Sequence, residues 1–262
     1  MLTLYEHPLS PYVIKVKIAL REKGVEFELK APDASEGGFG GSEFIEANPR
    51  RELPAFIAGD TKIFDSTIIL EYIEEKWSSP PLLQNSPEER ARIRMIEEVM
   101  DTYYEPINWG LGEIKFFGRA PGELGKTIIH NAEKHAAKCR QWLTKQLGAR
   151  EWFNGASFGW ADLCVVPHIN TSLIAFGIAP EENSPLAEWF KRASTRPSVV
   201  QTLNEAIRSL AGMDKYSNLL DSGDLKREYR DHRLEWMIRM GGLQVVIDGI
   251  EKDNIRFSYD FS

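Results

Sequence analysis

The spacing of apolar and polar residues divides the chain into a mixed first part and a helical remainder. Over residues 1–78, alternating apolar and polar positions predict four short strands, at 2–6, 25–31, 53–60 and 61–65. Apolar residues that recur every three or four positions predict two amphipathic helices in the same part, at 10–24 and 65–77. The expected order is β-α-β, then a loop, then β-β-α. The loop, residues 32–44, is too rich in Gly and Ser for regular structure.

After residue 78 the pattern becomes helical. A proline-bearing linker at 79–86 leads into an all-helical domain that we place at 87–211. Ser86 is the expected N-cap of its first helix, with Pro87 at the first helical position. Pro106 should kink or end this helix, because proline lacks the N–H that an α-helix needs. Further helices are predicted at 121–148, at 159–176, where Pro167 should introduce a bend, and as a pair over 184–210.

A C-terminal extension at 212–262 follows the helical domain. Its first half is charged and helical in pattern, and four residues give it an apolar stripe: Leu225, Tyr229, Trp236 and Met240. The extension could pack on the helical domain, cover the mouth of a site or join a subunit interface.

Composition narrows the class of protein. A chain of 262 residues, 42% hydrophobic and 27% charged, can form two soluble domains with cores. The formal net charge of −7 argues against a general affinity for nucleic acid. No stretch approaches the roughly 18 apolar residues of a membrane span, and the first residues lack the features of a signal peptide. We therefore expect a cytoplasmic protein that binds neither nucleic acid nor membranes.

Cysteine and histidine usage points away from disulfides and metals. The two cysteines, Cys139 and Cys164, lie in amphipathic segments, which predicts buried thiols in a reducing compartment. The five histidines are scattered, and no Cys/His cluster has the spacing of metal ligands. No metal site is expected.

Three short stretches of the first part place polar groups where a strand or helix begins. Ser10 followed by Pro11 is a common way to cap a helix. Pro54 stands at the start of a strand, where its missing backbone donor is tolerated. Asp65 and Ser66 open the next helix, with Ser66 as the expected N-cap. The first-turn N–H groups attract a carboxylate, and Asp65 can take an ammonium group beside it.

In this order and spacing, "HPLSPYVIKVKIAL", "NPRRELPAF" and "FDSTIILEYIEEKW" resemble the thioredoxin-like half of cytosolic glutathione transferases. "FNGASFGWADLCVVPHI" resembles the buried helix of that family's helical domain, although Gly159 replaces the usual Ser or Thr three residues before Asp162. The resemblance covers residues 1 to about 210. It implies a thioredoxin-like α+β domain of the β-α-β-β-β-α type, followed by an all-helical domain. "SPY" is similar to the triplet of serine-type members, such as the tau class.

The resemblance implies that glutathione binds along the first domain. The Leu53–Pro54 bond would be cis, and the backbone of Leu53 would pair with the cysteine residue of glutathione like an added strand. Asp65 and Ser66 would hold the γ-glutamyl group. Tyr12 would form a wall of the site.

One residue departs from the family pattern at this site. Glu52 stands where many members carry Lys or Gln, and an acid there would not favour the glycine carboxylate of glutathione. Arg51 or Arg50 would supply the positive charge instead.

The resemblance also makes Ser10 the group that holds the glutathione sulphur as a thiolate. Lowering a thiol pKa from about 8.5 to about 6.5 requires roughly 2.7 kcal/mol. A hydrogen bond to a charged acceptor contributes on the order of 1.5–3 kcal/mol, and the positive end of a helix ~0.3–1 kcal/mol. Tyr5, at the end of the first strand, and Tyr12 are alternative donors.

The implied function is attack of the glutathione thiolate on a hydrophobic electrophile by a homodimeric enzyme. Isomerisation, dehalogenation and ether cleavage use the same nucleophile and stay open. A non-enzymatic role also stays open, of the kind found in starvation-response regulators that are similar in fold. The electrophile pocket is expected between the domains, with one or two walls drawn from five aromatic residues: Tyr103, Tyr104, Trp109, Phe116 and Phe117.

Overall fold

A four-stranded mixed sheet in the order β2-β1-β5-β6 organises the first part of the chain. β1 pairs parallel with β2 and antiparallel with β5, and β5 pairs antiparallel with β6. This computed structural model describes residues 1–35, 38–211, 213, 229, 231–252 and 254–255. The elements of this first part are β1 (Leu2–Tyr5), α1 (Pro11–Glu22), β2 (Glu28–Lys30), β3 (Asp33–Ser35), β4 (Gly38–Gly40), α2 (Ser42–Ala47), β5 (Ala55–Ala58), β6 (Thr61–Phe64) and α3 (Ser66–Lys76). The predicted thioredoxin-like class is confirmed.

The Gly- and Ser-rich segment is more regular than predicted. In place of an irregular loop over 32–44, β3 and β4 pair antiparallel and α2 follows them. The hairpin was missed because its glycine-rich strands lack an alternating pattern. α2 is too short to display a helical period, yet it buries Phe44 and Ala47 beside Tyr5.

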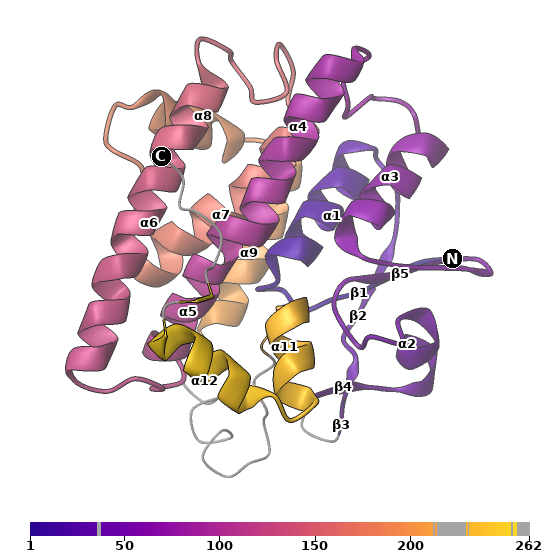
Figure 1. Ribbon diagram of the computed structural model, residues 1–262. Coiled ribbons are helices and arrows are strands. Elements are labelled where there is room, and N and C mark those ends of the chain that lie inside the picture. Colours follow the sequence, from indigo (N-terminus) through magenta and orange to yellow (C-terminus); the bar gives the residue numbers. More distant parts are fainter. Residues whose placement is uncertain (36–37, 212, 214–228, 230, 253, 256–262) are drawn as a thin grey trace.

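From Pro87 onward the named elements of the described chain are helices, which lie beside the sheet, with α1 between the two layers (Figure 1). α1 packs against α3, α7 and α9, so its residues 13–20 are all buried. The helices that follow the sheet in the sequence are α4 (Pro87–Val99), the π-helical η1 (Met100–Tyr104), α5 (Glu105–Lys115), α6 (Glu123–Leu147), α7 (Trp160–Phe176), α8 (Pro185–Ala193), α9 (Pro197–Leu210), α11 (His232–Arg239) and α12 (Leu243–Glu251). The expected helical domain is confirmed, whereas its boundary at 79–86, between α3 and α4, stays a prediction.

Pro106 neither ends its helix nor stands in an α-helical interior. The wider turns of η1 join α4 to α5, and the Glu105 N–H donates five residues back to the Met100 carbonyl. Because Pro106 has no N–H, the Asp101 carbonyl lacks the corresponding donor. The Tyr12 hydroxyl of α1 donates to that carbonyl at 3.0 Å. The carbonyl that Pro106 leaves without a helical donor therefore accepts a hydrogen bond from α1 instead.

The start of α7 explains the absent Ser or Thr at position 159. A Cβ there would lie 2.2 Å from the Asn154 side-chain nitrogen and 2.4 Å from the Leu82 carbonyl oxygen, so only glycine fits. Asp162 still accepts from the Gly159 N–H at 3.1 Å. Its carboxylate also accepts from two further backbone N–H groups and the Trp189 indole. The helix continues through Pro167.

Two predictions about capping and cysteine burial in the helical domain are confirmed. Ser86 caps α4 and Pro87 follows it, as predicted. Both cysteines are buried and free, also as predicted. Over the residues that the structure describes, no helix is long and apolar enough to cross a membrane. No cluster of three or more potential metal-binding side chains occurs in the same residues.

Tyr229, a described residue of the extension, contacts α5. Its ring packs edge-on against Trp109, with centroids 4.5 Å apart, and its hydroxyl donates to Glu113 at 3.2 Å. Arg119 lies over the same ring and pairs with Glu113. Two helices, α11 and α12, lie in the described part of the extension, whereas Leu225 lies outside the described residues.

We predict that Asp162→Ala lowers the free energy of unfolding by about 3 kcal/mol, because several buried donors lose their acceptor. Denaturant unfolding measures this, with Asp60→Ala in the exposed β5–β6 turn as the control. Equal stabilities for the two variants would contradict the role given to Asp162.

Candidate functional site

The strand register brings the three predicted motifs to one end of the sheet. Tyr5 of β1 pairs with Ala55 of β5, and Ala55 pairs with Phe64 of β6. The chain leaves β1 at Tyr5 towards Ser10, enters β5 from Leu53–Pro54, and leaves β6 at Phe64 towards Asp65. Residues from three distant parts of the sequence therefore surround the same strand ends.

Ser10 is the N-cap of α1. Its Oγ accepts a hydrogen bond from the Val13 N–H at 3.4 Å, and Pro11 occupies the first helical position. This cap was predicted, and it is compatible with a chemical role. A hydroxyl that accepts through a lone pair keeps its own proton for donation, and here it stands at the positive end of a helix.

Tyr5 is held away from such a role. The side chain is only 5% exposed, and its ring packs against Phe44 with centroids 5.1 Å apart. The hydroxyl donates to the Glu43 carboxylate of α2. Burial, followed by this bond and the nearby negative charge, raises the pKa of Tyr5 far above its ordinary value. The Tyr5 hydroxyl therefore already has an acceptor, whereas the role of Ser10 as a donor to a sulphur atom stays a prediction.

Tyr12 faces the helical domain through its hydroxyl, which donates to the Asp101 carbonyl. A contact between Tyr12 and glutathione stays a prediction.

The segment before β5 is organised by a buried asparagine that sequence reasoning missed. Asn48, 1% exposed, donates to the Glu52 carbonyl at 2.7 Å and accepts from the Arg50 N–H at 2.9 Å. The Leu53–Pro54 peptide that follows is cis, as the resemblance implied. The only available signal was that "NP" begins the motif, and it did not distinguish a structural asparagine from a turn residue.

The acid at position 52 has a local partner. Arg50 pairs with Glu52 at 3.0 Å, which offsets the negative charge that departs from the family pattern. Arg51 is exposed and has a positive φ of 55°. The assignment of Arg51 or Arg50 to the glycine carboxylate of glutathione stays a prediction.

The helix start at Asp65 and Ser66 corrects one expectation. Asp65, not Ser66, is the N-cap of α3, and its carboxylate accepts from the Thr67 and Ile68 N–H groups at 3.0 and 3.3 Å. Ser66 occupies the first helical position, where the backbone N–H has no acceptor within the helix. Asp65 has a φ of 72°, a conformation that costs on the order of 1–3 kcal/mol and persists where the surroundings impose it.

Buried lysines of α1 are the main feature that the sequence did not reveal. Lys15 pairs with Glu97 at 2.7 Å and Asp101 at 2.5 Å, both from the helical domain. Lys17 pairs at 2.5 Å with both Glu6 and Glu205. A charged residue inside an amphipathic pattern reads as exposed when its partners are distant in sequence. The buried ion pairs join the sheet domain to the helices.

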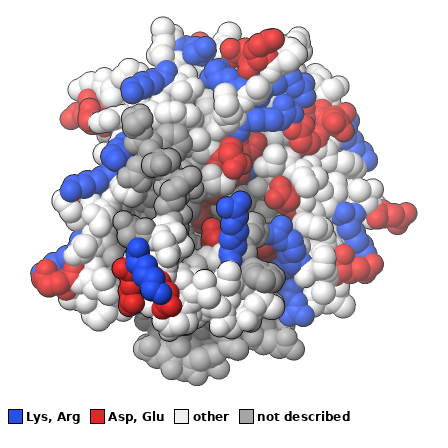
Figure 2. Space-filling model, viewed as in Figure 1, with Lys and Arg blue, Asp and Glu red and all other residues white. Residues whose placement is uncertain are grey.

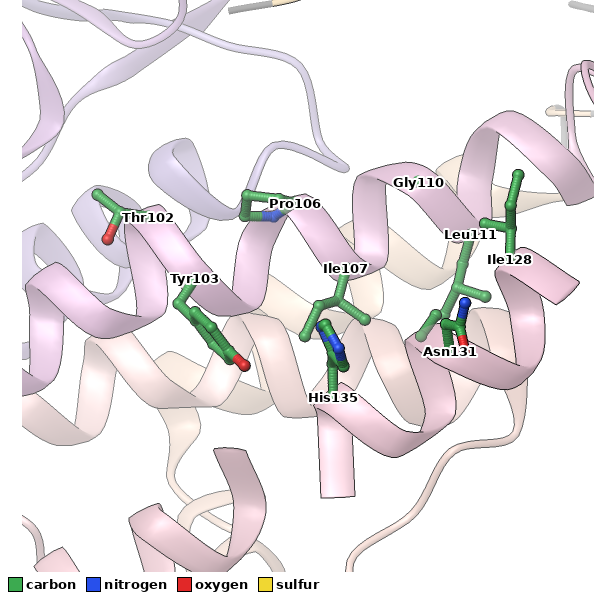
Figure 3. Close-up of a pocket in the computed structure, with 10 residues that line it drawn as sticks. Thr102, Tyr103, Pro106, Ile107, Gly110, Leu111, Ile128, Asn131 and His135 are labelled. Carbon is green, nitrogen blue, oxygen red and sulfur yellow. The ribbon is translucent and has the colours of Figure 1, made fainter. Parts of the chain in front are cut away.

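A cavity of about 400 Å³ lies between η1–α5 and α6 (Figure 3). Tyr103 and Ile107 point into it from one helix and His135 from the other. Tyr103 of the predicted aromatic set thus lines this cavity, which lies within the helical domain. Tyr104 is fully buried, and Trp109 packs against Tyr229. An electrophile site between the domains stays a prediction.

Surface charge offers no extended anion-binding face in the view of Figure 2. Acidic and basic side chains are interspersed there, in keeping with the net charge of −7.

Comparison with known proteins agrees with the fold. The family model "Glutathione S-transferase, N-terminal domain" matches residues 1–75. Glutathione S-transferase U22 of Arabidopsis thaliana is 30% identical over 212 residues, which is 77% of this chain and 89% of the relative. The stringent starvation protein A homolog of Coxiella burnetii is 28% identical over 224 residues, or 82% and 97% of the two chains.

A rice glutathione S-transferase solved in complex with glutathione has a TM-score of 0.68 to this structure. The match covers 85% of this chain and 96% of the rice protein at 24% identity, and it supports the fold alone. The sequence similarity over three quarters of the chain is the stronger finding. This chain belongs to the glutathione S-transferase family.

Proposed function

We propose that the protein is a glutathione transferase in which Ser10 stabilises the thiolate of bound glutathione for attack on an electrophile. The observation that carries the proposal is the convergence of Ser10, cis Leu53–Pro54 and Asp65–Ser66 on one end of the sheet. Each group offers a different chemistry: a hydroxyl donor, an edge for an extended peptide, and an acid beside first-turn N–H groups.

Each part of glutathione has a partner of matching chemistry in this arrangement. The γ-glutamyl carboxylate suits the Ser66 N–H, its ammonium suits Asp65, and the cysteine backbone lies along Leu53 as an added strand. Arg51 takes the glycine carboxylate. The thiol is then directed at the positive end of α1, where Ser10 donates to the sulphur.

The chemical step needs no covalent intermediate with the protein. The thiol proton passes to solvent, and the sulphur electron pair forms the new bond to the electrophilic carbon. In a substitution, the bond between that carbon and the leaving group breaks, and the leaving group takes the bonding electron pair. In an addition, the multiple bond of the acceptor opens, and its other carbon takes up a proton. The protein contributes thiolate stabilisation and proximity.

The proposal also includes a hydrophobic electrophile as second substrate, a role in detoxification and a homodimeric assembly. It further includes a cytoplasmic location, which the two reduced, buried thiols support.

We expect Asp65→Asn to weaken glutathione binding about tenfold or more, because it removes the charge opposite the ammonium while keeping an oxygen to cap α3. Isothermal calorimetry measures the change. Asp60→Asn, an equal charge change in the exposed β5–β6 turn, is the control and should bind like the wild type. Unchanged binding by Asp65→Asn would remove Asp65 from the site.

Ser10→Ala should lower kcat/KM with a standard electrophile by about tenfold to a hundredfold, the cost of one hydrogen bond to a charged acceptor. The substitution also removes a helix cap, so Ser86→Ala, which removes the equivalent cap of α4, is the matched control. Tyr5→Phe should leave kcat/KM within about twofold. A large loss in Tyr5→Phe with little loss in Ser10→Ala would transfer the role to Tyr5.

The alternative from another class is a non-enzymatic interaction protein, and the similarity to the stringent starvation protein A homolog is what favours it. The retained Ser10, Leu53–Pro54 and Asp65–Ser66 favour the enzyme. Calorimetry on the wild-type chain separates the two, since an interaction protein without a glutathione site shows no heat of binding at millimolar glutathione.

A further inference from the structure

One buried carboxylate joins the two helices that carry opposite ends of the proposed glutathione site. Oε1 of Glu97 accepts from Lys15 Nζ of α1 at 2.7 Å and from Thr67 Oγ1 of α3 at 2.9 Å. Oε2 accepts from Trp160 Nε1 of α7 at 2.5 Å. Glu97 itself belongs to α4 and is only 3% exposed. The helical domain thus holds both helices of the site through a single side chain.

Both attachments lie close to the residues that would touch glutathione. Lys15 follows Ser10 by little more than one turn of α1. Thr67 is the second residue of α3, and its backbone N–H donates to Asp65 Oδ1 at 3.0 Å while its hydroxyl donates to Glu97. A shift of the Glu97 carboxylate is therefore transmitted to Ser10 through α1 and to Asp65 through Thr67.

The opposite charges of Lys15 and Glu97 restrict the position of α1 relative to α4. Burial on its own would lower the pKa of Lys15, but the carboxylates of Asp101 and Glu97 outweigh that effect and raise it. Lys15 therefore remains a buried cation. Hydrogen bonds between ionised partners are short and strongly directional, and here they are shielded from solvent. A neutral side chain at position 97 would keep the volume and lose this constraint.

We propose that Glu97 is a positioning residue for the glutathione reaction: it fixes α1 relative to α3, and so fixes Ser10 relative to Asp65 and Ser66. The inference rests on the proposed function and adds a residue outside the site, on the helical domain, that sets the geometry of the site. The Ser10 hydroxyl must meet the sulphur while Asp65 holds the far end of the same tripeptide. If the spacing between α1 and α3 changed, glutathione could make only one of these two contacts at a time.

The test compares Glu97→Gln with Glu98→Gln in the full-length protein. Glu98 is the next residue of α4 and is exposed, so the control makes the same chemical change outside the network. Steady-state kinetics give KM for glutathione and for the electrophile separately. We expect Glu97→Gln to raise KM for glutathione about tenfold, as misplaced binding groups do, with KM for the electrophile within about twofold. Glu98→Gln should match the wild type.

Thr67→Val removes only the hydroxyl link between Glu97 and α3, so it tests the proposal even if Glu97→Gln fails to fold. It should raise KM for glutathione about threefold to fivefold. In the double variant with Glu97→Gln the two rises in KM for glutathione should not be additive, because both substitutions act on the same hydrogen-bonded cluster.

Two results would overturn the proposal. One is an unchanged KM for glutathione in both variants. The other is an equal rise in KM for both substrates together with additive effects in the double variant, as a purely structural role would give. A wild-type chain that does not bind glutathione would contradict the proposed function, and this inference with it. Binding by the wild type with no loss in the variants contradicts only the inference.

Discussion

The register across β1, β5 and β6 is the constraint on which the candidate site depends. Pairing of Tyr5 with Ala55 and of Ala55 with Phe64 places three chain segments at one end of the sheet. A slip of one residue would turn every side chain of the slipped strand to the opposite face. Buried Leu4 and Phe56, which pair across β1 and β5, oppose such a slip. The hydrophobic core of the sheet therefore determines where the polar chemistry gathers.

Ion pairs buried between the layers supply the second constraint. α1 lies between the sheet and the helices, and its apolar side chains alone would pack there without charged contacts to distant elements. Lys15 and Lys17 each reach carboxylates on the helical domain, so the position of α1 is specified by directional contacts. Burial of charge is costly, and removal of one partner costs more than the pair contributes. Such pairs are better understood as fixing one arrangement than as adding stability.

Sequence reasoning recovered the features that depend on local patterns. The strands of the sheet, the caps at Ser10 and Ser86, and the buried helix after Gly159 follow from periodicity and capping chemistry. The cis bond before Pro54 was predicted too, but from the resemblance. Features that depend on distant partners were not recovered. Asn48 has only the weak local signal of the "NP" pair, and Glu97 has none, because it is defined by contacts with three other helices.

The N-cap of α3 shows how a local rule can fail by one position. Serine is a favoured cap, so Ser66 was expected to begin the helix, whereas Asp65 does so with a positive φ. The sharp exit from β6 decides the outcome, because it turns the Asp65 carboxylate back over the first N–H groups. This places the acid and the helix end together, as the proposed binding of an ammonium beside a carboxylate requires.

The most direct test of the account is the pKa of the thiol in bound glutathione, measured on the wild-type protein by the ultraviolet absorbance of the thiolate as a function of pH. A thiol beside Ser10 and the start of α1 should titrate near 6.5, about two units below an ordinary thiol at about 8.5. A bound thiol that titrates at about 8.5 or above would contradict the account, because the site would then hold glutathione without preparing it to react.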